Sequence, residues 1–162
     1  MIIVSAVEIN RPVDDVWHAV AQRFDKAHEW MGFVENSYKV EEKVDIEGAP
    51  MAGRVCEFTK EPNGLKAEER ILRFSEQKRE FDFDVVPVNA PKLFPVKKNI
   101  VTLAVKKLSG GRAEVVWQSN IELTKFGYVT YPFIKFGLSK NFKGIMEDLK
   151  EYMESHKDRL AA

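Results

Sequence analysis

The sequence contains a single cysteine, Cys56, in 162 residues. An unpaired thiol excludes a disulfide framework, and we expect a protein of the reducing cytoplasm. No apolar run approaches the roughly 20 residues that cross a membrane. The 25 basic and 25 acidic residues cancel, and no local run of lysine or arginine replaces a net charge. We therefore expect neither a nucleic-acid partner nor stable insertion into a membrane.

Motifs that bind cofactors or perform known chemistry are also lacking. His18, His28 and His156 are scattered without the spacing of a metal site, and we expect His28 at the surface. There is no glycine-rich phosphate loop and no Gly-x-Ser-x-Gly turn. We expect no metal and no cofactor, and the sequence identifies no catalytic residue. The first eight residues indicate a strand rather than a signal peptide, because they carry no basic leader.

Alternating apolar and polar residues predict seven β-strands in a single domain spanning residues 1–162. Pro12 favours the first turn of a short helix, and Gly32 ends a second short helix. Turns rich in glycine, proline or asparagine separate the later strands, which indicates antiparallel hairpins. The predicted strands are 2–9, 35–43, 51–59, 65–74, 78–86, 97–108 and 112–123, and the predicted helices are 12–22, 25–31 and 130–159.

The last predicted helix is long and amphipathic. Gly137 and Gly144 weaken it by roughly 1 kcal/mol each, so we expect its regular part to start nearer Ser139 than Tyr131. One long helix needs one broad apolar partner, and the sequence supplies only an antiparallel sheet. The apolar stripe repeats every three or four residues and consists of Leu138, Phe142, Ile145, Met146, Leu149, Tyr152 and Met153.

A series of short motifs follows this order of elements. They are Arg11-Pro12 with Asp15-Val16-Trp17, Arg23-Phe24-Asp25-Lys26 with Trp30, Gly53-Arg54-Val55, Glu69-Arg70-Ile71-Leu72 with Arg79-Glu80-Phe81, and Val115-Val116-Trp117. Over nearly its whole length the chain thereby resembles the START-related (SRPBCC) superfamily, which includes birch-pollen allergens, plant abscisic-acid receptors and polyketide cyclases. The pattern is most similar to the bacterial polyketide cyclase/dehydrase and lipid-transport group.

The resemblance implies an α+β helix-grip fold, in which a curved seven-stranded antiparallel sheet wraps around a long C-terminal helix. Two short helices would separate the first two strands. It also implies a cavity between sheet and helix that binds a hydrophobic or amphipathic small molecule, lipid-like or polyketide-like. The gate and latch motifs of the plant hormone receptors are not found here.

Binding without chemistry is the leading hypothesis. One alternative is an enzyme of the polyketide cyclase, aromatase or dehydratase type, since folding a flexible substrate into a reactive geometry is itself catalytic. Another is a protein-binding module whose aromatic rim docks a partner. We expect a monomer or a weak homodimer.

The clearest alternation in the chain predicts one wall of the cavity. Phe81, Phe83 and Val85 alternate with acidic residues, so we expect them to face the interior. They would either contact the ligand or pack as core beneath the long helix. Phe58, two residues beyond Cys56, is expected to share this interior.

Periodicity leaves open which face of the strand 65–74 points inward. The resemblance to the plant receptors implies that Glu69 faces the cavity, and Arg54 is its candidate partner. This pair would be either a polar anchor for a ligand hydroxyl or carbonyl, or an exposed cross-strand ion pair. Glu35 matches a ligand-anchoring lysine of those receptors, and the reversed charge argues against an acidic ligand held in the same way.

Two further features lie on the last strand and at the rim. We expect Trp117 to be buried, whereas the resemblance would turn Gln118 inward, and both can do so only across a bulge. Large apolar residues cluster at the proline loop and at the start of the last helix, which suits either a gate or a hydrophobic plug. The candidate ligand-binding residues are Glu35, Tyr38, Arg54, Phe58, Glu69, Ile71, Phe81, Phe83, Val85, Phe94, Trp117 and Phe133.

Overall fold

The computed structural model describes residues 1–155. Its strands are β1 (Ile2–Ile9), β2 (Asn36–Lys39), β3 (Gly53–Glu57), β4 (Lys66–Ser75), β5 (Glu80–Val88), β6 (Val96–Lys107) and β7 (Ala113–Leu123). Its helices are α1 (Val13–Trp17), η1 (His18–Gln22), η2 (Phe24–Glu29), η3 (Ser109–Gly111), α2 (Lys125–Val129) and α3 (Tyr131–Ser155).

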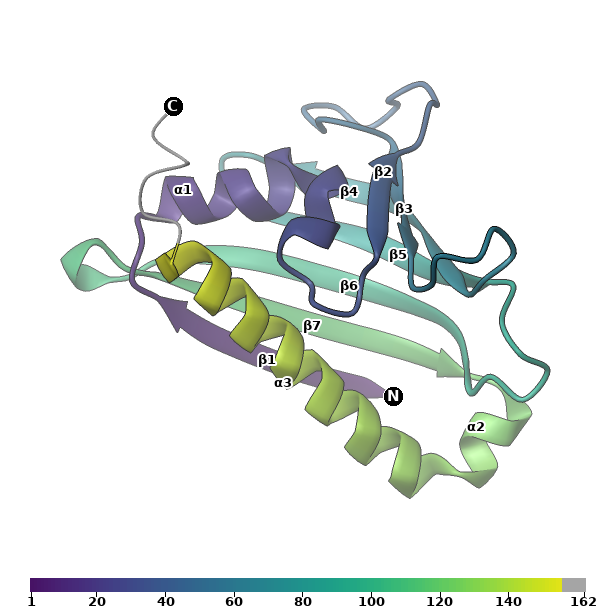
Figure 1. Ribbon diagram of the computed structural model, residues 1–162. Coiled ribbons are helices and arrows are strands. Elements are labelled where there is room, and N and C mark those ends of the chain that lie inside the picture. Colours follow the sequence, from purple (N-terminus) through teal and green to yellow (C-terminus); the bar gives the residue numbers. More distant parts are fainter. Residues whose placement is uncertain (156–162) are drawn as a thin grey trace.

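The seven strands form one antiparallel sheet in the order β1-β7-β6-β5-β4-β3-β2. Helix α3 crosses one face of this sheet, and α1, η1 and η2 cover the other end of the same face (Figure 1). The predicted helix-grip arrangement is confirmed, including the short helices between the first two strands. None of the helices formed by residues 1–155 combines the length and apolar character that a membrane span requires.

Helix α3 differs from the prediction at its start. It is continuous from Tyr131, so the expected late start near Ser139 is wrong. Gly137 and Gly144 have open space around them, and they lower helix propensity without breaking the backbone ladder. The separate helix α2 was not predicted, and Thr124 caps it by accepting a hydrogen bond from the Gly127 backbone N–H at 3.2 Å. The predicted end of the last helix near Arg159, like His156, lies outside the described residues.

The strand boundaries differ where turns intervene. The predicted strands 35–43 and 51–59 shorten to β2 and β3, whereas β5 continues through Pro87 to Val88. Pro87 is tolerated because pairing with β6 ends at Val85, which leaves one side of the strand free of the ladder there. A register shift between Ile71 and Arg73 interrupts β4.

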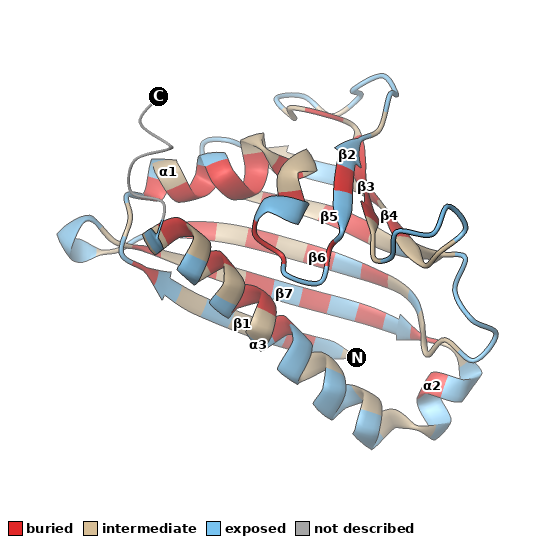
Figure 2. Cartoon of the chain, in the orientation of Figure 1, coloured by how far each residue is buried: buried red, intermediate tan, exposed pale blue. Residues whose placement is uncertain are grey.

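An aromatic core fills the half of the sheet that lies under α1 and η1. Phe24 makes edge-on contacts with Phe81 and Phe83, at ring-centroid distances of 5.4 and 5.0 Å. Trp17 and Phe74 pack beside them at 5.4 Å. The buried stripe of α3, from Phe142 to Met153, covers the adjoining part of the sheet (Figure 2). The cavity lies over the other half of the sheet, where Trp117 packs against Phe142 of α3 at a ring-centroid distance of 6.2 Å.

Candidate ligand-binding cavity

A cavity of about 190 Å³ lies between the sheet and the middle of α3. Its floor comes from β3 to β7, and its roof from α3 around Phe142 and Ile145. The segment before β2 and the loop before β6 close the sides. Exposed Phe33 and Asn141 belong to its wall, so the cavity reaches the surface between this segment and α3. Most of the wall is apolar, including Phe58, Leu65, Val85, Val96, Ile121 and Leu138.

Strand periodicity puts these side chains in the wall. On β4 the inward face carries Ala67, Glu69 and Ile71, which settles the choice that the sequence left open. On β7 Trp117 is buried and Gln118 is exposed, with an unbroken register to β1. The expectation for Trp117 is confirmed, and the inward Gln118 is wrong because no bulge interrupts β7.

Arg54 and Glu69 form a buried ion pair across β3 and β4. The Arg54 Nε donates to Glu69 Oε2 at 2.7 Å, and the two residues are only 2% and 6% exposed. The Arg54 Nη1 donates to the carbonyl oxygen of Phe24 at 2.7 Å, with the guanidinium 3.9 Å from the Phe24 ring centroid. The alternative of an exposed cross-strand pair is therefore wrong, since this pair is enclosed by protein.

Electrostatics at this pair are dominated by burial. Removal from water raises the pKa of the Glu69 carboxyl, while the Arg54 guanidinium and the Cys56 thiol oppose that rise. Burial also raises the pKa of Cys56, to about 12, so this thiol is neutral. Glu69 and Cys56 both belong to the cavity wall, whereas Arg54 lies behind them. The arrangement presents a carboxyl group held in place by a fixed positive charge.

A second polar group of the wall lies on β6 and β7. Asn99 Nδ2 donates to Ser119 Oγ at 3.1 Å, and the Trp117 indole N–H donates to the same oxygen at 3.0 Å. Asn99 is 7% exposed and its Oδ1 has no partner within residues 1–155. A buried acceptor without a donor is costly, so this oxygen is available to a hydroxyl or amine inside the cavity.

The structure brings five of the predicted site residues together in the wall: Phe58, Glu69, Val85, Phe94 and Trp117. Arg54 joins them through Glu69. Phe81, Phe83 and Ile71 face inward as expected but lie in the packed core rather than in the wall, with Phe81 and Phe83 fully buried. Alternation predicts which face of a strand a residue lies on. Whether an inward residue lies in the packed core or in the cavity wall depends on how far α1 and η1 extend over the sheet.

The remaining three candidates lie away from the cavity. Glu35 is exposed, and its nearest cationic partner is Lys60, at 3.8 Å. Tyr38 is 42% exposed and lines a separate polar groove beside Lys39. Phe133 is 81% exposed on α3. None of these side chains contributes to the wall described above.

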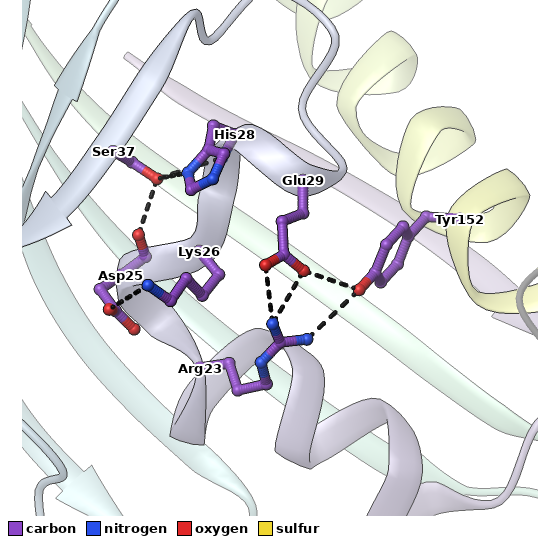
Figure 3. Close-up of polar contacts among 7 residues, drawn as sticks. All are labelled: Arg23, Asp25, Lys26, His28, Glu29, Ser37 and Tyr152. Atoms are coloured by element: carbon purple, nitrogen blue, oxygen red, sulfur yellow. Dashed lines mark hydrogen bonds and ion pairs between the residues drawn. The ribbon is translucent and has the colours of Figure 1, made fainter. Parts of the chain in front are cut away.

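Polar contacts fix the side of the cavity that precedes β2 (Figure 3). Arg23 pairs with Glu29 at 2.7 Å, and the Tyr152 hydroxyl of α3 donates to Glu29 at 3.0 Å. Ser37 on β2 donates to the Asp25 carbonyl oxygen at 2.7 Å. These bonds connect η2 both to α3 and to β2. His28 is exposed, as predicted, and within residues 1–155 no cluster of acidic, histidine or cysteine side chains could hold a metal ion.

Both amide side chains of the wall, Asn99 and Asn141, were missed by sequence reasoning. Asn99 has the same parity on β6 as the buried Val101, Leu103 and Val105. A polar residue at an inward position of an otherwise apolar series is a signal that could have identified it. Asn141 lies one turn from Leu138 at the edge of the α3 stripe, and no comparable pattern marks it.

A family model described as "Polyketide cyclase / dehydrase and lipid transport" matches residues 1–154. A START superfamily protein from Mycobacterium smegmatis has a TM-score of 0.73 at 8% identity, covering 95% of this chain and 97% of that chain. The protein XoxI from Bacillus cereus has a TM-score of 0.70 at 18% identity, covering 98% of this chain and 99% of the other.

The di-domain ARO/CYC protein BexL has a TM-score of 0.74 at 16% identity, and the match covers 95% of this chain and 46% of BexL. No curated protein gives a significant match. At these identities the likeness to solved structures establishes the shared fold.

Proposed function

Because the chain belongs to the polyketide cyclase/dehydrase and lipid transport family, we propose that it binds or transports a hydrophobic or amphipathic small molecule in the cavity under α3. The observation that carries this proposal is an apolar wall that contains two buried polar groups, Glu69 and Asn99. Apolar walls favour a ligand that removes hydrocarbon surface from water, and a few fixed polar groups orient it. We place this activity in the cytoplasm, a proposal supported by the single unpaired Cys56.

The two polar groups specify which ligand chemistry fits. The free Oδ1 of Asn99 accepts a hydrogen bond, and so does a carboxylate oxygen of Glu69. A ligand carboxylate would face the buried carboxyl of Glu69 without a free cation, because Arg54 is already engaged by Glu69 and Phe24. The preferred ligand is therefore a lipid-like or polyketide-like molecule with hydroxyl or amine donors, not a free acid.

Native mass spectrometry of the protein purified from its own host tests this proposal. We expect an additional bound mass that organic solvent extracts. Leu138→Trp should displace it, because Leu138 is half-buried in the cavity wall. Glu147→Trp adds the same ring to the exposed side of α3 and should retain the ligand. Wild-type protein that carries no bound mass and takes up no fluorescent long-chain alcohol would contradict the proposal.

A cyclase or dehydratase activity is the second candidate, and the Glu69 carboxyl favours it. This carboxyl belongs to the cavity wall, and burial raises its pKa, so it is the group placed to exchange a proton with an oxygen of a bound substrate. The likeness to the ARO/CYC protein BexL adds support at the level of fold. Turnover of a labelled poly-β-ketone, lost in Glu69→Gln, would establish this activity, and binding without turnover would exclude it for that substrate.

A further inference from the structure

One end of the molecule exposes an unusual number of large apolar side chains. They lie on α2, on the first half of α3 and on the loop between β5 and β6, which adjoin one another (Figures 1 and 2). The Thr124 hydroxyl donates to the carbonyl oxygen of Phe94 at 3.0 Å and thereby joins α2 to this loop. The end surface consists of Leu93 (64% exposed), Phe126 (40%), Tyr128 (63%), Val129 (83%), Phe133 (81%) and Phe136 (75%).

Charge is strongly segregated at the same end. Residues 124–146 contain four lysines and no aspartate or glutamate, and the neighbouring loop adds Lys92. The second half of α3 carries Glu147, Asp148, Glu151 and Glu154 instead. The chain is neutral overall, so this local excess is hidden in its net charge. The lysines form no basic run, because they are spaced along the helices (Lys125, Lys135, Lys140 and Lys143).

Four of these five lysines are available to an external anion. Within residues 1–155, Lys143 forms an ion pair with Glu147 at 3.7 Å, while Lys92, Lys125, Lys135 and Lys140 form none. Exposed aromatic and aliphatic side chains surrounded by unpaired lysines are typical of a surface that lies at a bilayer interface. The apolar groups enter the headgroup boundary, while the lysine stems extend toward anionic lipid phosphates.

We propose that this end surface docks reversibly on a lipid bilayer that contains anionic headgroups. A second copy of the chain fits less well, since a symmetric contact would bring lysines against lysines. The docking needs no spanning helix, because the side chains enter only the interfacial layer. A neutral membrane offers the apolar contact without the charge, so the anionic headgroup is part of the proposal.

The cavity lies next to the end surface that would contact the bilayer. Phe94 and Leu138 belong to the cavity wall, and Phe94 follows Leu93 of the end surface while Leu138 lies two residues beyond Phe136. An apolar ligand could pass between the cavity and the docked bilayer over a short path shielded from water. This consequence rests on the proposed ligand binding, whereas the docking itself rests only on exposure and charge.

Co-sedimentation of the full chain with vesicles tests the docking. We expect binding to vesicles of equal parts phosphatidylcholine and phosphatidylglycerol, weaker binding to phosphatidylcholine alone, and release by high salt. Phe133→Asp with Phe136→Asp should reduce binding at least tenfold. Lys135→Glu and Lys140→Glu should each reduce binding about fivefold or more, because one lysine near an anionic surface contributes roughly 1 kcal/mol to binding.

Matched controls lie in the exposed loop between β2 and β3, far from α2 in Figure 1. Val44→Asp and Lys43→Glu introduce the same acidic side chains there, Lys43 being paired with Asp45, and should leave vesicle binding unchanged. The docking proposal would be overturned if wild-type protein did not bind anionic vesicles. It would also be overturned if the Phe133→Asp/Phe136→Asp variant bound them as wild type does. A dimer that the same variant dissociates would also overturn it, in favour of a second copy.

Ligand retention in the variants keeps the two proposals separate. Native mass spectrometry of the Phe133→Asp/Phe136→Asp protein should still show a bound ligand, because neither side chain lines the cavity. Loss of vesicle binding with retained ligand supports docking, whereas absence of ligand in every variant and in wild type contradicts only the cavity function.

Discussion

Arg54 and Glu69 face each other at 2.7 Å in the interior, and Arg54 also binds the carbonyl oxygen of Phe24. One guanidinium thus connects β3, β4 and the start of η2. Both charged groups are buried away from water, so their mutual attraction offsets the cost of desolvating each one. The same pair holds the carboxyl of Glu69 at a fixed position in the cavity wall.

Removing one charge of this pair should cost more stability than removing both. Arg54→Leu leaves an unpaired carboxylate in the core, and we expect a loss of about 3 to 5 kcal/mol in the free energy of unfolding. Glu69→Leu should be similarly costly, and the double variant should lose less than either single variant. Urea denaturation of the four proteins measures this coupling. Additive losses would show that the two charges do not compensate each other.

Cys56 should resist alkylation while the protein is folded. Burial raises its pKa from 9.0 to about 12, so at pH 8 the thiolate fraction is on the order of one in ten thousand. Iodoacetamide labelling followed by mass spectrometry should be slow in buffer and fast in urea. Equal labelling rates in the two conditions would show that the thiol is accessible and ordinary.

The raised pKa of the Cys56 thiol also predicts a loss of stability at alkaline pH. The folded state holds the Cys56 proton more tightly than the unfolded chain does, because the folded pKa is raised. The stabilisation is complete below pH 9.0 and is lost as pH rises toward about 12. Comparing urea midpoints of wild type and Cys56→Ala across this range isolates the contribution. A constant difference between the two proteins would contradict the shift.

Tyr152 should stabilise the attachment of η2 to α3. Its hydroxyl donates to Glu29 at 3.0 Å and accepts from Arg23 at 3.3 Å (Figure 3). Tyr152→Phe keeps the ring and removes these bonds, so we expect a loss of about 1 kcal/mol measured by urea denaturation. Tyr128→Phe removes a hydroxyl from an exposed ring and serves as the control. Equal losses in both variants would mean that the bonds to Glu29 and Arg23 contribute nothing specific.

The sequence predicted the order of elements because strand alternation and turn residues are local properties. It also predicted the buried face of β5, since Phe81 and Phe83 alternate with acidic residues. Whether these rings line a cavity depends on how far α1 and η1 reach over the sheet, which is a tertiary property. The inward face of β4 was undecidable for a related reason. Its two faces have similar polarity, and the inward Glu69 is compensated by Arg54, a partner on another strand.

The end surface shows a different limit of sequence reasoning. Phe133 has the same residue type as a core side chain, but no element within residues 1–155 covers it, and it is exposed. Its neighbours on α3 were assigned to a gate or a plug, because the sequence does not show which part of a helix the sheet covers. The fully buried stripe of α3 begins at Phe142, and the first half of the helix contacts the core only through the half-buried Tyr131, Ile134 and Leu138.

Gly53 and Gly144 should respond in opposite directions to alanine. A Cβ at Gly53 would overlap the backbone carbonyl oxygen of Glu69, so β3 would have to separate from β4 beside the Arg54 pair. We expect Gly53→Ala to destabilise the protein by about 1 to 3 kcal/mol and to weaken ligand retention. Gly144→Ala meets open space on α3 and should stabilise by about 1 kcal/mol.

Urea denaturation and native mass spectrometry of both variants distinguish the packing effect at Gly53 from the helix-propensity effect at Gly144. A Gly53→Ala protein that unfolds at the wild-type midpoint would show that β3 and β4 adapt without cost. Retained stability with lost ligand would instead show that the close approach of these strands serves the cavity alone. The expected result couples the two, because the backbone of Glu69 lies against Gly53 while its side chain belongs to the cavity wall.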